Sequence, residues 1–575
     1  MSEEIGYVLG TQEATPLQFW VAVKDGSVLR LDDVVSVTTD RPDGRGQVRF
    51  YGVIDYVRTL HEGAEFDTDT FLAKSGNIPV AVSYAAHVQV TRLDPEEYLP
   101  PQPGDSVQRA VADDLKQALH FDSMDTCIPA GLMRNGEAAY FNYAFVNGDK
   151  GAHVNISGIS GVATKTSYAL FLLHAILNSP ATGSANQKKA LIFNVKGQDL
   201  FFLDKANSKR DRYEQKSSRN GDRLQALGLP VEPFRNVKFC APPRKGAKQL
   251  VGTIDQRTDG AVAPYLWSVR EICHDRLFRF LFVGEELERG NLVYLLGSVE
   301  ENLAKLAKNS DRKASYLEVP DGYGEHGKFR VTCFEELIEL LEDRLIESEE
   351  WLARNTPSTG LALIRRLWGV RDEVSHLIRG DMSLEELAKY RLDPLGRDRM
   401  LTVADINSLG AKAQMFVVGV VLRRLFSEKE KLGKDPTIFV VLDELNKYAP
   451  REGRSPIKEL LVEIAERGRS LGIILIGAQQ TASEVERRVV GQAAIRVVGR
   501  LDAAEANRPE YSYLSQSSRQ RVLFMKSGTM VVQQPEVPAP ILVEFPFPPY
   551  ATRKAEVADA IATDAKVEAD FYDDL

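Results

Sequence analysis

The chain has 575 residues, of which 43% are hydrophobic and 27% are charged, with a formal net charge of -9. The charges are mixed in sign, as in ordinary soluble proteins. The negative net charge argues against a basic protein that coats DNA. It does not exclude a ring that holds DNA in its pore, because only the lumen of such a ring must be positive. Because a single core stops growing at about 250–300 residues, at least two domains are expected.

The spacing of the cysteines and the hydropathy of the chain indicate the cellular environment in which the protein works. The cysteines lie far apart with no CxxC pair, at Cys127, Cys240, Cys273 and Cys333. This spacing argues against a zinc site or a disulfide framework and fits a reducing environment. The first residues lack a basic segment and an apolar run, and no stretch reaches the ~18 apolar residues of a membrane span. We therefore expect a soluble, cytoplasmic protein that enters no membrane.

A small β-barrel is predicted for residues 1–98. Short apolar runs separated by polar turns are typical of such a domain. They cover residues 7–10, 19–23, 34–38, 47–54 and 80–90. The proline-rich segment 99–104 follows and is predicted to be a stiff linker and a domain boundary.

An α/β core is predicted in two parts, residues 105–263 and 391–550. Its strand-length runs are rich in Val and Ile and apolar on both faces, which is typical of a parallel sheet covered by helices. These runs are 153–157, 190–195, 438–442, 473–477 and 496–500. Helical stretches such as 167–177 and 411–425 alternate with them.

A helical insertion is predicted to divide this core at residues 264–390. Charged, helix-forming stretches such as 334–354 and 362–377 dominate there, and strand signals are few. The tail, residues 551–575, is rich in Ala and Asp and is expected to be a short helix or disordered.

The loop after the strand at 153–157 carries the first chemical motif. It contains mostly small residues, ends in Lys165-Thr166 and leads into an apolar helix. This context suits phosphate binding, because backbone N–H groups and the helix amino terminus both face an anion. Lys165 is expected to bind β- and γ-phosphate oxygens, and Thr166 to bind Mg²⁺. The predicted nucleotide-binding residues are Gly158, Ser160, Gly161, Val162, Ala163, Thr164, Lys165, Thr166 and Ser167.

The spacing of this loop leaves an alternative open. Ile159 and Thr164 stand where the usual GxxxxGK[ST] pattern has glycine, and the glycines lie at 158 and 161. Taken alone, the loop could therefore be a glycine-containing βα turn with a chance Lys-Thr pair.

A second motif favours the nucleotide site. The apolar run 438–442 is followed directly by Asp443 and Glu444. A buried strand that ends in two acids places carboxylates at the carboxyl edge of a parallel sheet, where ligands bind. Asp443 is expected to bind Mg²⁺, and Glu444 to orient or deprotonate the attacking water. A strand that merely ends at a polar turn is the alternative, but both motifs together predict an ATP hydrolase that uses ATP and Mg²⁺.

The order of further segments resembles the HerA/FtsK superfamily of DNA-pumping ATPases. Segment 465–472 (AERGRSLG) is similar to the family segment that supplies an arginine to the neighbouring subunit, which makes Arg469 the first candidate and Arg467 the second. Two solvated arginines are the alternative. Segment 473–481 resembles the strand with the family's sensor glutamine, so Gln480 is the expected catalytic residue, with Gln479 adjacent. Asn194 stands where the family usually has Asp.

This resemblance implies a fold, partners and a function. The fold is a RecA-like P-loop ATPase core with a helical insertion behind an N-terminal barrel, as in HerA-type proteins. It implies a homo-hexameric ring that passes DNA through its pore and docks a nuclease or a sirtuin-type, NAD-hydrolysing effector on the barrel. The altered loop is similar to that of bacterial HerA-like proteins in two-component anti-phage systems.

Other functions remain open from the sequence. A scaffold or regulatory ATPase ring with little translocation is one alternative, and an ATPase of DNA-end resection in repair is another. Basic clusters that could face DNA lie at 205–223, 244–248 and 308–313, with a preference for the first. Charge runs of this kind are usually solvated faces, so no single residue is assigned.

Overall fold

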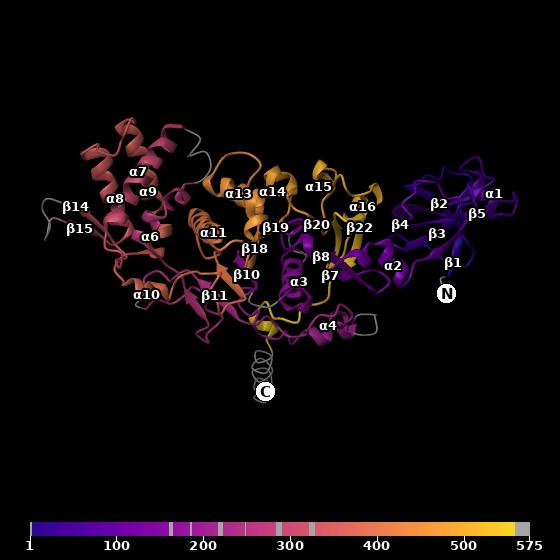
Figure 1. Ribbon diagram of the computed structural model, residues 1–575, viewed down its shortest axis with the longest axis horizontal. Coiled ribbons are helices and arrows are strands. Elements are labelled where there is room, and N and C mark those ends of the chain that lie inside the picture. The colour runs from indigo at the N-terminus through magenta and orange to yellow at the C-terminus, as the bar shows by residue number, and fades with distance from the viewer. Residues whose placement is uncertain are drawn as a thin grey trace, which may run out of the picture.

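A computed structural model shows an elongated molecule with the barrel at one end, the α/β core in the middle and the helical insertion at the other end (Figure 1). The structure describes residues 3–159, 165–183, 187–216, 222–247, 249–282, 290–320 and 328–557. The architecture predicted from the sequence, an α/β core with a large parallel sheet behind an N-terminal barrel, is confirmed.

The barrel closes in the strand order β1-β2-β5-β4-β3-β6. Its strands are β1 (Glu4–Val8), β2 (Gln18–Val23), β3 (Val34–Asp40), β4 (Gln47–Glu62), β5 (Ala81–Asp94) and β6 (Ser106–Arg109). Alternate side chains such as Phe19, Phe50 and Val88 fill its interior. Because β6 pairs with both β1 and β3, it closes the barrel after the proline-rich segment 99–104. The barrel therefore extends past the predicted end at residue 98.

The hairpin of β4 and β5 is longer than the barrel wall. Residues 59–62 of β4 pair with residues 81–84 of β5 beyond the part of β5 that pairs with β2, and the short helix α1 (Asp69–Lys74) lies in the connection. This arm exposes apolar side chains to solvent, including Leu60, Phe66, Phe71 and Val82.

The core sheet has, within the described residues, twelve strands in the order β12-β11-β17-β10-β18-β19-β9-β20-β21-β22-β7-β8. The first eight are parallel: β12 (Val262–Pro264), β11 (Val237–Ala241), β17 (Leu401–Asp405), β10 (Lys188–Asn194), β18 (Thr437–Asp443), β19 (Ile473–Gln479), β9 (Val154–Ser157) and β20 (Ile495–Val498). The antiparallel remainder is β21 (Thr529–Gln534), β22 (Val537–Glu544), β7 (Cys127–Leu132) and β8 (Ala138–Asn142).

Helices cover both faces of the parallel part. Helix α3 (Lys165–Asn178) packs against one face with Phe439 and Val441 of β18. Helices α11 (Ala411–Leu432) and α13 (Pro456–Leu471) pack against the other face with Val440 and Leu442. Every residue of β18 is thus buried, which is why its sequence is continuously apolar.

The insertion is mainly helical, as its sequence predicts. Its helices are α6 (Val269–His274), α7 (Gly290–Asn309), α8 (Phe334–Glu342), α9 (Pro357–Val374) and α10 (Leu384–Ala388). Two small strand pairs accompany them: β13 (Trp267–Ser268) with β16 (Ile378–Arg379), and β14 (Leu317–Pro320) with β15 (Lys328–Val331). The helix predicted over 334–354 ends at Glu342, and a π-helical turn, Asp343–Glu347, continues it.

The remaining helices are short and lie in connections. They are α2 (Asp113–Ala118), α4 (Arg210–Lys216), α5 (Arg223–Ala226), α12 (Leu445–Tyr448), α14 (Arg487–Gly491), α15 (Ala503–Ala506) and α16 (Gln516–Arg521). Helix α16 joins the barrel to the core, because Arg521 forms an ion pair with Asp32 at 2.9 Å. The four cysteines are free thiols. In the part of the chain that the structure describes, no helix has the length and apolarity of a membrane span, and no group of three or more His, Cys, Asp and Glu side chains suits a metal.

His153 is expected to make the core sensitive to acid. Its Nδ1 accepts from the Leu475 N–H at 2.9 Å and its Nε2 donates to the Ala465 carbonyl at 3.0 Å, so the neutral ring joins β9, β19 and α13. Burial lowers the pKa of His153 from 6.5 to about 4. Between these pH values the unfolded chain binds the proton and the folded chain does not, so stability falls by up to about 3 kcal/mol as the pH drops.

Melting temperatures measured between pH 7 and pH 4.5 test this expectation. His153→Gln does not titrate and should melt at a lower temperature at pH 7, with a smaller further loss at pH 4.5. An equal loss in both proteins on acidification would contradict the role of His153.

Candidate functional site

The loop motif and the acid pair meet at the carboxyl edge of the parallel sheet. Thr166, on the first turn of α3, donates a hydrogen bond from Oγ1 to Asp443 Oδ2 at 2.7 Å. Asp443 ends β18, two strands from β9, and its side chain is only 5% exposed. Residues 160–164, which carry five of the predicted nucleotide-binding positions, lie outside the described residues. The N–H of the flanking residue Gly158 donates to the Gln479 carbonyl at 3.2 Å. This bond extends the pairing of β9 with β19 by one residue.

Lys165 opens helix α3 and is buried. Burial lowers the pKa of its ammonium group, the carboxylates of Asp443 and Glu444 oppose that shift, and nearby Lys196 adds to it. An ammonium at the amino terminus of a helix attracts anions, and the two carboxylates beside it offset part of that attraction.

Lys196 belongs to the same cluster. It lies in the turn after β10, and its Nζ is 3.2 Å from Asp443 Oδ2 and also donates to Thr166 Oγ1. The sequence shows this residue in the turn after the strand at 190–195, but no role was predicted for it. Its place depends on the adjacency of β10 and β18, which the sequence alone does not reveal.

Glu444 is held in an unusual backbone conformation. Its φ of 57° lies in the left-handed region, which is uncommon for a residue with a side chain and clusters at functional sites. Its N–H donates to Asp443 Oδ1 at 2.9 Å, and its side chain is exposed. Asp443 therefore faces the α3 side of the cluster while Glu444 presents its carboxylate to solvent beside it.

Tyr448, on the short helix α12, is a neighbour that the sequence did not single out. Its hydroxyl is buried and has no hydrogen-bond partner among the described residues. Burial raises the pKa of this hydroxyl, and the charges of Glu444 and Asp443 add to that shift. An unpaired buried hydroxyl is costly, so it favours a ligand or water atom at this position.

The two glutamines at the end of β19 differ in environment. Gln479 is fully buried, and its Nε2 donates to Asn155 Oδ1 at 2.8 Å and to Ser157 Oγ at 3.1 Å. Gln480, the predicted catalytic residue, follows it at the same sheet edge and is exposed. Gln479 thus fixes the end of β9, while the role of Gln480 stays a prediction.

The two candidate arginines lie at the opposite, amino edge of the sheet, because α13 leads into the start of β19. Arg469 donates from Nε to the Gly148 carbonyl at 3.2 Å. Arg467 pairs with Glu430 at 3.0 Å and lies over the Phe426 ring. Both guanidinium groups therefore make their contacts at the sheet edge opposite to the one where β18 ends in Asp443.

Asn194 shapes the turn that carries Lys196. Its Oδ1 accepts from the Lys196 N–H at 3.1 Å, and its Nδ2 donates to the Gly197 carbonyl at 2.8 Å. The same amide lies 3.4 Å from Asp405 at the end of β17, where burial raises the pKa of the Asp405 carboxyl. At this position the amide of Asn194 holds the backbone of the turn and contacts Asp405.

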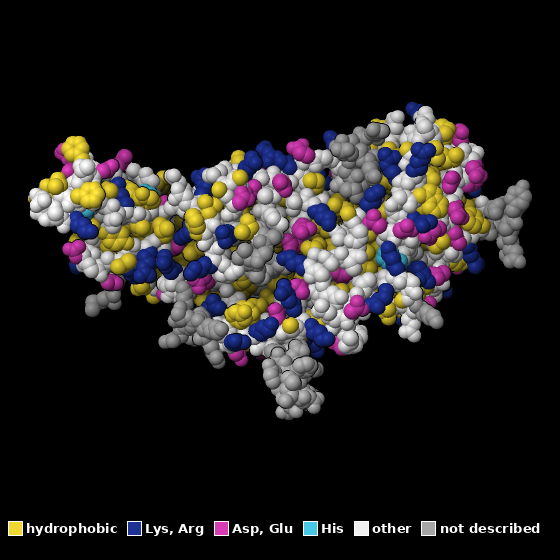
Figure 2. Space-filling model, turned by 180° about the vertical axis from the view of Figure 1, so that it is seen from behind, with side chains coloured by type: hydrophobic (Ala, Val, Ile, Leu, Met, Phe, Trp, Pro, Cys, Tyr) yellow, Lys and Arg dark blue, Asp and Glu magenta, His cyan; other side chains and the backbone are white. Residues whose placement is uncertain are grey.

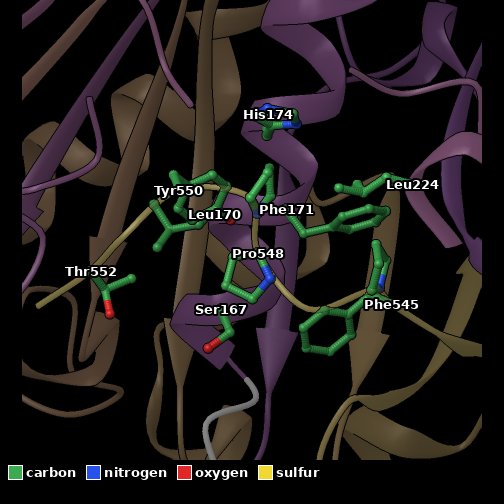
Figure 3. Close-up of a pocket in the computed structure, with 11 residues that line it drawn as sticks. Ser167, Leu170, Phe171, His174, Leu224, Phe545, Pro548, Tyr550 and Thr552 are labelled. Atoms are coloured by element: carbon green, nitrogen blue, oxygen red, sulfur yellow. The ribbon is translucent and has the colours of Figure 1, made fainter. Parts of the chain in front are cut away.

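A small apolar pocket lies along α3 (Figure 3). Ser167, predicted to bind nucleotide, lines it with Phe171, His174, Phe545 and Tyr550. Its volume of about 30 Å³ holds a water molecule and excludes a nucleoside base. Ser167 therefore lies beside the carboxyl-terminal segment 545–552, and its predicted contact with nucleotide stays a prediction.

Basic side chains are interspersed with acidic ones over the face shown in Figure 2. In the first predicted DNA cluster, Arg210 pairs with Asp211 at 3.2 Å and with Asp222. Tyr213 stacks on Phe547 with ring centroids 4.3 Å apart. Residues 217–221 of this cluster lie outside the described residues, and its contact with DNA stays a prediction.

Comparisons with known proteins give a general likeness. No family model and no curated protein matches the chain. The solved structure of VirB4 of Thermoanaerobacter pseudethanolicus aligns at 14% identity and a TM-score of 0.44, over 74% of this chain and 98% of that one. The plasmid coupling protein TrwB in complex with ADP and Mg²⁺ aligns at 13% identity and 0.42, over 70% and 88%. The genome packaging NTPase B204 of Sulfolobus turreted icosahedral virus 2 aligns at 14% and 0.20, over 26% and 69%.

Proposed function

We propose that the chain is a Mg-ATP-hydrolysing P-loop ATPase of the HerA/FtsK type that works as a ring motor on DNA. The observation that carries this proposal is the contact of Thr166 with Asp443, with Lys165 and Lys196 beside them. A hydroxyl and a carboxylate that face one another, with an ammonium against both, form an oxygen-rich place for a cation, and Mg²⁺ prefers oxygen ligands. The residues therefore fit Mg-ATP.

Each residue has a separate task in this proposal. Thr166 and Asp443 would hold Mg²⁺, which neutralises phosphate charge when it is bound. Lys165 would bind β- and γ-phosphate oxygens. Glu444 would orient the attacking water and accept its proton, since its carboxylate is exposed next to Asp443. Gln480 would hydrogen-bond the γ-phosphate or the water from the end of β19.

The ring and its partners belong to the same proposal. Arg469, with Arg467 second, would serve the site of the adjacent subunit in a homo-hexamer, and DNA would pass through the pore. The barrel would dock a nuclease or an NAD-hydrolysing effector, in the cytoplasm and in anti-phage defence. The apolar arm of β4 and β5, with Phe66 and Phe71 exposed, supports docking, since exposed apolar patches mark interaction surfaces.

A scaffold or regulatory ATPase is the second candidate, and Thr164 favours it. A β-branched residue stands there in place of the glycine that permits close phosphate approach, which would slow turnover. An ATPase of DNA-end resection is the further alternative within the motor class.

The ATPase rate with and without DNA distinguishes the candidates. A motor is expected to hydrolyse ATP several-fold faster when DNA is added. Indifference to DNA, with stimulation by the co-purified effector, would replace the motor with the scaffold. If the chain does not bind ATP, both the motor and the scaffold ATPase are wrong.

Arg469→Ala is expected to stop hydrolysis, because an arginine supplied to the transferred phosphoryl group is worth about 10³-fold or more in turnover. ATP binding should change little, since Arg469 lies at the far sheet edge from Asp443 of its own chain. Arg467→Ala, which breaks the pair with Glu430, is the matched comparison and should retain more activity.

Co-expressed rings test the action in trans. Arg469→Ala keeps its own Glu444, and Glu444→Gln keeps its own Arg469, so a mixed ring contains complete sites between neighbours although each pure ring is inactive. Mixed rings should recover part of the wild-type rate. Mixed rings as inactive as the pure ones would reject Arg469 as a residue that acts on the next subunit.

A further inference from the structure

The ammonium group of Lys196 lies where the metal is expected. Its Nζ contacts Asp443 Oδ2 at 3.2 Å and also contacts Thr166 Oγ1, and Asp443 and Thr166 are the two residues that would hold Mg²⁺ under the proposed function. We propose that Lys196 is a place-holding cation that occupies the metal position in the nucleotide-free protein and competes with Mg²⁺ for it. This inference rests on the proposed function, because it concerns the same site.

The charge balance of the site explains why a cation is needed. The Asp443 side chain is 5% exposed, and a buried carboxylate is unfavourable unless a positive charge accompanies it. Lys165 contributes one charge from the first turn of α3, and Lys196 contributes a second in direct contact with the carboxylate. Without nucleotide, Lys196 therefore compensates the charge that the metal would otherwise compensate.

The two cations would exclude one another. Thr166 and Asp443 would hold Mg²⁺, and the Lys196 ammonium contacts both of these side chains, so the two positive charges would lie close together and repel. Loading of the metal therefore requires Lys196 to withdraw, and loss of the metal lets it return.

The local structure allows this withdrawal without a change of fold. The Lys196 side chain is 45% exposed, so it has an open path to solvent on a flexible four-carbon stem. Its backbone is fixed at the same time, because Asn194 accepts from the Lys196 N–H and donates to the Gly197 carbonyl. The device is thus a side-chain movement on a fixed turn.

Binding of Mn²⁺ to the nucleotide-free full chain tests the proposal, with the signal of unbound Mn²⁺ in electron paramagnetic resonance as the readout. Removal of the competing ammonium in Lys196→Gln or Lys196→Met should tighten Mn²⁺ binding by about tenfold. Lys196→Arg keeps a cation and should stay close to wild type. Lys150→Ala is the control, since Lys150 is similarly exposed at 51% but pairs with Glu536.

Asp443→Asn separates the two proposals, and the melting temperatures show whether each variant folds. If Asp443→Asn leaves Mn²⁺ binding unchanged, the metal site of the proposed function is wrong. If Asp443→Asn abolishes binding while Lys196→Gln and Lys196→Met bind Mn²⁺ no more tightly than wild type, only the competition is overturned. Tighter binding in both Lys196 variants, lost on addition of Asp443→Asn, supports both.

Discussion

Glu444→Gln is expected to lower ATP turnover by about 10²–10⁴-fold and to leave ATP bound, because a general base contributes this much and the amide cannot accept a proton. Gln keeps the size of the side chain, and the N–H of residue 444 can still bond Asp443 in the left-handed conformation. Phosphate release measured in steady state, together with equilibrium binding of a fluorescent ATP analogue, reports both halves of the expectation.

Glu452→Gln is the matched control for this variant. Glu452 is an exposed acid in the connection after α12, eight positions beyond Glu444, and its loss removes the same charge. It should hydrolyse ATP at the wild-type rate. Full turnover in Glu444→Gln would overturn the catalytic assignment, and equal damage from Glu452→Gln would show that net charge matters more than position.

Lys165→Ala is expected to weaken ATP binding by roughly 10- to 100-fold, because hydrogen bonds from a charged group to phosphate are each worth about 1.5–3 kcal/mol. The ammonium is buried beside Asp443, so the alanine variant also leaves that carboxylate with less positive charge around it. Isothermal titration with a slowly hydrolysed ATP analogue and Mg²⁺ measures the change.

Lys150→Ala serves as the comparison, since it removes one lysine that pairs with Glu536 outside the site. Its affinity should equal that of the wild-type protein. The melting temperature of Lys165→Ala shows whether the variant folds, because it loses a buried ammonium and also leaves Asp443 with less positive charge. If Lys165→Ala binds ATP as tightly as the wild-type protein, the loop does not bind phosphate. It is then a simple βα turn, which is the alternative that the spacing of its glycines allows.

The turn with Lys196 also connects the site to distant parts of the core. Gln198 accepts from the backbone N–H groups of Asp255 and Gln256 at 3.1 and 2.8 Å. Asp199 pairs with Arg553 at 3.0 Å near the carboxyl-terminal segment. The turn that carries Lys196 is therefore tied to residues 255–256 and to the carboxyl-terminal segment.

Local patterns predicted the chemistry-bearing elements well. The strand β18 was evident because burial on both faces requires every residue from 438 to 442 to be apolar, and the acids at 443 and 444 mark its carboxyl end. Helix α3 followed from the apolar run after Lys165-Thr166, although it begins at Lys165 and not at 167.

Two strands, β6 and β17, depend on pairing with strands that are distant in the sequence, so local patterns did not reveal them. The strand β6 has four residues and becomes a barrel strand only through its partners β1 and β3, so the local sequence predicts a domain boundary at the proline-rich segment before it. The strand β17 was not expected either, yet it lies between β10 and β11 and places Asp405 beside Asn194.

The sequence by itself determined the positions of the two motifs from which nucleotide binding is predicted, because the loop at Lys165 and the acids at 443–444 are each recognisable from a few neighbouring residues. Only the tertiary structure decided that Thr166 touches Asp443, that Lys196 reaches both, and that Arg469 faces away. The reason is physical: strand order and helix placement arise from burial across the whole sheet, and contacts between residues that are 277 positions apart in the chain leave no mark in the local pattern.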